Sequence, residues 1–78
     1  MTAHVMDRFY KKGSGGFMVL VFRPAGTVIH DDLGTDTVTA DTWSVGWELG
    51  ATTDSGYARY DFADYDAARA YYNAEANI

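Results

Sequence analysis

The sequence contains no cysteine, which excludes disulfide bonds and thiolate metal sites. Its only histidines are His4 and His30, so a zinc centre would need carboxylate ligands as well. The longest apolar run, residues 17–22, is far too short to cross a bilayer. The first residues lack the basic segment and apolar run of a secretory signal. We therefore expect a cytoplasmic protein that does not act at a membrane.

Basic residues are also scarce. Six Lys and Arg stand against eleven Asp and Glu, and the net charge is −5. Direct binding of nucleic acid is not expected, because phosphate contacts require a basic face. Residues 1–23 hold four of the basic residues and one acidic residue, so the other ten acidic residues follow them. This asymmetry suits an acidic surface for a basic partner, or head-to-tail self-association.

The pattern of apolar residues predicts a small sheet followed by a helix. With 78 residues the chain has room for one domain, residues 1–78. Apolar residues alternate in residues 43–49 and 58–62, and residues 51–56 between them are typical of a turn. This alternation predicts a hairpin of strands 42–50 and 56–62.

The N-terminal half predicts a second hairpin. Residues 4–12 fit either an exposed strand or a short amphipathic helix, and the glycine-rich turn at 13–16 favours the strand. Residues 17–22 are apolar on both faces, which predicts a central strand. Residues 27–30 predict a short strand. Residues 31–41 predict the longest loop, with a brief strand around Val38.

A helix is predicted to begin near Asp64, which suits an N-cap, with Asp66 in its first turn. Its expected apolar stripe is Ala67, Ala68, Tyr71, Tyr72 and Ala74. The predicted fold class is therefore α+β, an antiparallel sheet of four to five strands with one C-terminal helix packed on one face.

Catalytic and metal-binding motifs are weak. The glycines at 13–16 lack the Lys and Ser/Thr of a phosphate-binding loop. The acidic residues of the 31–41 loop do not match EF-hand spacing, so we interpret them as a solvated surface, and metal binding there stays an open alternative. His30 with nearby carboxylates and Glu48 could form a metal-dependent hydrolase centre, but nothing in their spacing specifies one. We assign no catalytic residue, metal ligand or cofactor.

Small size, acidity and aromatic content favour a non-enzymatic protein-interaction module. These features suit a phage or mobile-element inhibitor, anti-CRISPR-like or nucleic-acid-mimicking, that occludes a protein partner such as a nucleic-acid-handling complex. No residue motif ties the chain to those proteins. The alternatives are a homodimer that binds a small ligand and a small metal-dependent enzyme. The residues expected to bind the partner are Asp31, Asp32, Asp36, Asp41, Trp43, Trp47, Tyr57, Asp61, Asp64 and Asp66.

Overall fold

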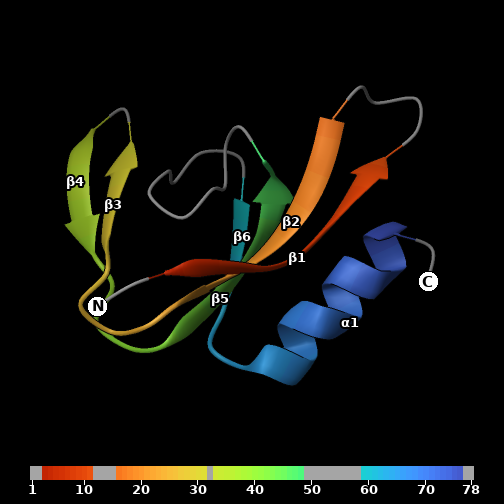
Figure 1. The fold of residues 1–78 in the computed structure, drawn as a ribbon. Coiled ribbons are helices and arrows are strands. Elements are labelled where there is room, and N and C mark those ends of the chain that lie inside the picture. The colour runs from red at the N-terminus through yellow and green to blue at the C-terminus, as the bar shows by residue number, and fades with distance from the viewer. Residues whose placement is uncertain (1–2, 12–15, 32, 49–58, 77–78) are drawn as a thin grey trace.

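The computed structural model describes residues 3–11, 16–31, 33–48 and 59–76 (Figure 1). Within these residues it contains six strands and one helix, and the predicted α+β fold class is confirmed. The elements are β1 (His4–Lys11), β2 (Gly16–Arg23), β3 (Val28–Asp31), β4 (Gly34–Thr37), β5 (Thr42–Trp47), β6 (Arg59–Phe62) and α1 (Tyr65–Ala76).

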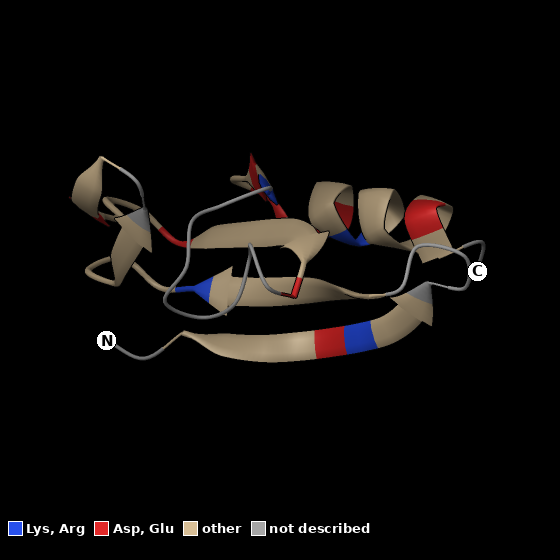
Figure 2. Cartoon of the chain, turned by 90° about the horizontal axis from the view of Figure 1, so that it is seen from above, with Lys and Arg blue, Asp and Glu red and all other residues tan. Residues whose placement is uncertain are grey.

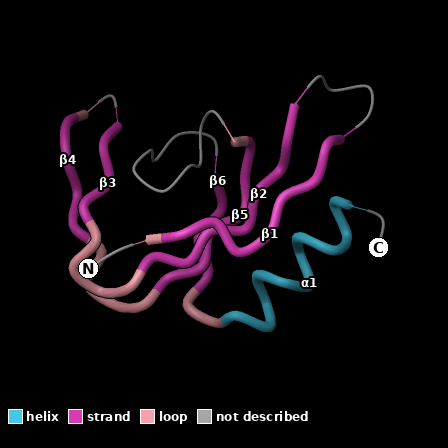
Figure 3. Tube along the Cα trace, in the orientation of Figure 1, coloured by secondary structure: helices cyan, strands magenta, loops and turns pink. Residues whose placement is uncertain are grey.

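The main sheet has four antiparallel strands in the order β1-β2-β5-β6 (Figure 3). Between β2 and β5 the chain leaves this sheet to form the separate hairpin β3–β4. β2 is central, as its apolar sequence predicted, and residues 18–21 of β2 are buried on both faces. The helix packs over β2, β5 and β6.

The hairpin β3–β4 corrects the prediction of a long loop. Residues of β4 lie in that predicted loop, yet they pair with β3 from Val28 opposite Thr37 to Asp31 opposite Gly34. Backbone hydrogen bonds close the base of the hairpin, from Gly26 N to Val38 O at 2.7 Å and from Val38 N to Thr27 O at 2.8 Å. All four β4 residues are exposed, so the strand carries no apolar alternation by which to recognise it.

β1 is a strand, as favoured, but its alternation is interrupted. A β-bulge shifts the register between Val5 and Asp7. Met6 and Asp7 therefore both face the helix, whereas Val5 faces the opposite side with its partner Val21. The two-residue alternation of a regular strand is therefore broken at this point.

The helix begins where the cap chemistry predicted. The Asp64 carboxylate accepts a hydrogen bond from the Ala67 backbone N–H at 2.9 Å, which makes Asp64 the N-cap. Ala68 and Tyr72 are buried as expected, but Ala67 and Ala74 are exposed. Within the described part of the chain, no helix has the length and apolarity needed to cross a membrane.

The core lies between the helix and the sheet. Its buried residues come from β2, β5 and α1, and partly buried aromatic side chains surround them. The buried members are Met18, Leu20, Val45, Ala68 and Tyr72.

Candidate functional site

An open groove lies where the sheet extends past the start of the helix. The twelve residues of α1 span about 18 Å, whereas the eight residues of β2 span about 26 Å. Figure 1 shows that β1 begins well beyond the N-terminal end of α1. The helix therefore leaves one end of its face of the sheet uncovered.

Four side chains from four elements line this aromatic groove: Met6 of β1, Phe22 of β2, Trp43 of β5 and Tyr65 of α1. Its volume is about 350 Å³. The Trp43 ring centroid lies 5.2 Å from that of Phe22 and 6.4 Å from that of Tyr65. His4 extends the aromatic surface, because its ring meets Phe22 edge-on at 5.5 Å.

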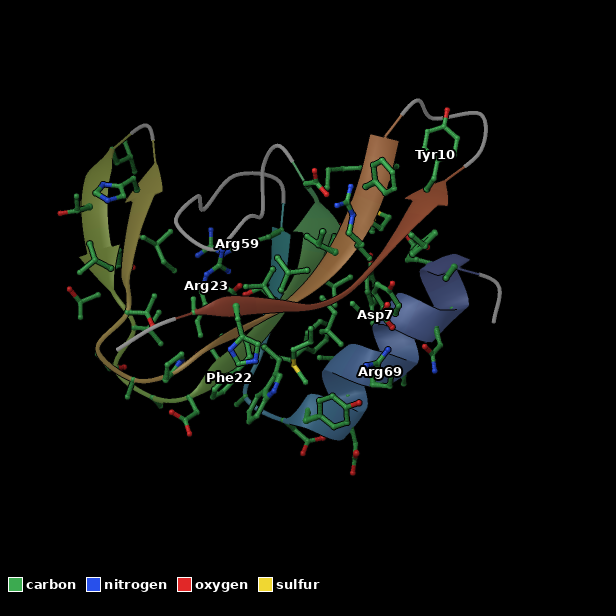
Figure 4. The ribbon with its side chains drawn as sticks, in the orientation of Figure 1. Asp7, Tyr10, Phe22, Arg23, Arg59 and Arg69 are labelled. Carbon is green, nitrogen blue, oxygen red and sulfur yellow. The ribbon has the colours of Figure 1, made fainter. Side chains whose placement is uncertain are left out.

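An ion pair holds the helix against the edge strand beside the groove. Arg69 Nη1 lies 2.9 Å from Asp7 Oδ2, and Figure 4 shows these side chains facing one another. Arg69 also donates from Nε to the Tyr65 hydroxyl at 2.9 Å, which orients one wall of the groove. The hydrogen bond from Arg69 holds the pKa of Asp7 below its usual value. The bulge makes this contact possible by turning Asp7 toward the helix.

Two carboxylates, which we name the acidic rim, flank Tyr65 in sequence: Asp64 and Asp66. Both are exposed, and the partner of Asp64 is an uncharged backbone N–H. Three other described carboxylates carry a cationic partner instead. The arginine-paired carboxylates are Asp7 with Arg69, Glu48 with Arg8, and Asp61 with Arg59.

The structure brings only some of the predicted partner-binding residues to the groove. Trp43 lines it, and Asp64 and Asp66 are exposed residues next in sequence to its lining residue Tyr65. Trp47 shares the face of Trp43, but it packs against the core at the other end of β5. The sequence analysis missed Met6, Phe22 and Tyr65 as groove residues.

The remaining predicted acidic residues are dispersed, as Figure 2 shows for the ribbon as a whole. Asp36 is exposed on β4, and its Oδ1 accepts from the Thr37 N–H. Asp41 accepts from the Ala25 N–H at 3.0 Å and so supports the turn after β2. Asp32, Tyr57 and the side chain of Asp31 lie outside the described residues.

A polar cluster on the other face of the sheet was also missed. Asp61 Oδ1 accepts hydrogen bonds from Ser44 Oγ at 2.6 Å and from Arg59 Nε at 2.8 Å. Arg23 is fully buried, although arginine is rarely buried in folded proteins. The cluster gives Asp61 internal partners, which makes it a weaker candidate for binding a partner protein.

His30 and Glu48, which the hydrolase hypothesis combines, lie on different parts of the fold. His30 lies on the hairpin that follows the end of β2. Glu48 lies at the opposite end of that strand, because its N–H donates to Phe17 O at 2.8 Å. Among the residues that the structure describes, no three His, Asp or Glu side chains form a group that could hold a metal ion.

Because the Tyr72 side chain is buried, we expect the protein to lose stability in alkaline solution. Burial raises the pKa of Tyr72 to about 12, whereas an unfolded tyrosine titrates near 10. The contribution of the neutral Tyr72 hydroxyl to stability is therefore fully present below about pH 10 and is lost as the pH rises toward about 12. We expect the free energy of unfolding to fall by on the order of 2–3 kcal/mol across this window. Urea titrations at several pH values will measure it. A Tyr72→Phe variant should lose most of this dependence, and an equally steep fall in that variant would contradict the assignment.

No family model, no curated protein and no solved structure matches the chain, so the functional assignment rests on the geometry of the aromatic groove and its acidic rim.

Proposed function

We propose that this protein is a small non-enzymatic interaction module that binds a protein partner through the aromatic groove and the acidic rim. One observation carries the proposal: Met6, Phe22, Trp43 and Tyr65 line an open groove at the surface, where Trp43 and Tyr65 also pack against the edge of the core. Tryptophan and tyrosine are enriched among residues that dominate binding energy at protein interfaces. An open apolar groove beside polar residues is typical of an interaction site.

The groove is better supported as the binding surface than an array of carboxylates that imitates nucleic acid. Asp7, Glu48 and Asp61 are each paired with an arginine. Their charges are therefore largely compensated within the protein. A mimic of phosphates would require a regular row of uncompensated charges, because phosphate charges dominate binding to nucleic acid.

In this proposal the protein acts by occlusion. It covers the partner surface that contributes side chains to the groove, as an inhibitor encoded by a phage or mobile element would do in the cytoplasm. Acidity and small size support this mode, since neither requires a chemical step. A nucleic-acid-handling protein is a suitable class of partner, because such proteins carry basic surfaces that attract an acidic module.

Two substitutions in neighbouring residues test the role of the groove. Met6 and Val5 are each 40% exposed, but the bulge directs them to opposite faces of the sheet. Met6→Arg places a cation and a long side chain in the groove, whereas Val5→Arg makes the same change of charge on the other face. We expect the tagged wild type and Val5→Arg to retain the same protein from nuclease-treated bacterial lysate. Met6→Arg should lose at least 90% of it.

Equal capture by all three proteins would show that another surface binds the partner. The thermal unfolding of both variants must first match that of the wild type, so that loss of binding reports the groove and not misfolding.

A homodimer is the second candidate, and the position of β1 favours it. β1 is an edge strand of the four-stranded sheet. Val5 and Tyr10 are exposed along it, and exposed edges tend to pair with other chains. Sedimentation equilibrium separates the two candidates, since Val5→Arg should dissociate a dimer formed through this face.

A further inference from the structure

The size and surroundings of the aromatic groove indicate the chemistry of its occupant, and this inference rests on the proposed function. We propose that the groove receives one large apolar side chain from a partner segment, and that Lys or Arg residues flank this side chain in the segment.

The volume limits what can enter. A groove of about 350 Å³ is at the lower end of the range for ligand sites. It accommodates one or two side chains, not the whole face of a helix. The described lining residues, Met6, Phe22, Trp43 and Tyr65, carry no charge, so the inserted group is apolar. Met6 adds a flexible side chain that adapts to the shape of that group.

The negative charge beside the groove favours basic residues on either side of the inserted side chain in the partner segment. Asp64 and Asp66 place two exposed carboxylates at the start of α1. The helix dipole supplies roughly half a positive charge there, which compensates only part of their charge. Arg69 is the nearby cation, and its guanidinium is already held by Asp7 at 2.9 Å. The entrance of the groove next to Tyr65 is therefore negative and favours a basic segment.

The ring faces add a second attraction for the same residues. Trp43 presents aromatic surface at the groove, whereas one face of the Tyr65 ring is already covered by the Arg69 guanidinium, 5.5 Å from the ring centroid. A Lys or Arg side chain can lie across the Trp43 ring with its charged end near the acidic rim. An acidic flanking residue would face both the carboxylates and the negative ring faces. The two features therefore select the same chemistry.

Defined peptides test the inference directly. Four peptides share a Gly-Ser frame: Phe flanked by Lys, Phe flanked by Ser, Phe flanked by Glu, and Ala flanked by Lys. Titrations of the isotope-labelled protein follow the Trp43 indole N–H and the Met6 methyl resonances by NMR, which detects millimolar binding. We expect the Phe–Lys peptide to bind most tightly, the Phe–Ser peptide more weakly, and the other two not at all. Raising the salt concentration should weaken only the Phe–Lys peptide.

Matched charge variants identify the carboxylates responsible. Asp64→Asn with Asp66→Asn removes the acidic rim but keeps a good N-cap, because asparagine also caps helices. We expect affinity for the Phe–Lys peptide to fall about two- to fivefold for each carboxylate removed, and affinity for the Phe–Ser peptide to stay constant. Asp36→Asn removes an exposed charge on β4 and should change neither affinity.

The possible failures are distinguishable. Equal binding of the Lys-, Ser- and Glu-flanked Phe peptides, or a preference for Glu, overturns the inference and leaves the groove as a binding site. If no Phe peptide perturbs the Trp43 and Met6 resonances, the aromatic groove is not a docking site, and the inference and the proposed function both fail.

Discussion

Replacing Tyr72 by alanine is expected to remove a large fraction of the stability of this protein. Tyr72 is only 1% exposed, and its ring packs edge-on against Phe9 with a centroid distance of 5.2 Å. Truncating a buried aromatic residue to alanine costs about 3–5 kcal/mol. A domain of this length has a total stability of about 4–12 kcal/mol, so this cost is a large fraction of it. Loss of Tyr72 also leaves Arg69 without one of the two rings that its guanidinium covers.

Urea unfolding followed by far-UV circular dichroism measures the effect. Tyr72→Phe is the matched control, because it keeps the ring and removes only the hydroxyl. We expect that control to cost about 1 kcal/mol, the typical value of one hydrogen bond. A cost below 1 kcal/mol for Tyr72→Ala would be incompatible with a central position of this ring in the core.

Ala68→Leu is expected to produce the second largest effect. Ala68 is fully buried at the contact between α1 and the sheet, in the same cluster as Leu20 and Val45. A larger side chain there must displace the helix from the sheet or adopt a strained rotamer. Overpacking of this kind typically costs about 1–3 kcal/mol. Displacement of the helix would also move Tyr65 and alter the aromatic groove.

The neighbouring alanine supplies the control. Ala67 is exposed, so Ala67→Leu makes the same chemical change without entering the core. Since leucine and alanine are both good helix formers, we expect its effect to be within about 0.5 kcal/mol of zero. Thermal unfolding of the two variants compares them directly. Equal melting temperatures would mean that α1 does not pack on the sheet through Ala68.

The features that the sequence predicted correctly are set by nearby residues. The alternation around Trp43 and the apolar run of β2 identify two strands because both patterns lie within a few residues. Asp64 identifies the helix start because an N-cap bonds a backbone N–H three residues later. The predicted apolar stripe of the helix was only partly correct, because it omitted Tyr65. Counting from Tyr65 in steps of three and four places Ala68 and Tyr72 on the buried side.

The missed features depend on distant contacts. The bulge at Met6 arises from the register in which β1 pairs with β2. The charged sequence of β1 contains no pattern that marks an inserted residue. β4 is held by backbone hydrogen bonds, which leave no pattern in the side chains. The burial of Arg23 could not be predicted, because arginine is ordinarily assigned to the surface.

Of the four described residues that line the aromatic groove, the sequence singled out only Trp43. Trp43 and the two rim carboxylates were chosen for their chemistry alone. Phe22 was expected to be buried as part of a central strand, and Tyr65 marked only the start of a helix. Their convergence requires the three-dimensional arrangement, since Met6 and Tyr65 are brought together by the bulge and by the docking of α1.

The helix being shorter than the sheet has an evolutionary consequence. Leu20 and Tyr72 help to hold the fold together and lie in the core between the helix and the sheet, whereas Met6 and Phe22 lie past the end of the helix. Selection can therefore vary the side chains at the uncovered end of the sheet while the buried core is conserved. The same separation makes the uncovered end of the sheet a natural position to randomise in a library of engineered binders.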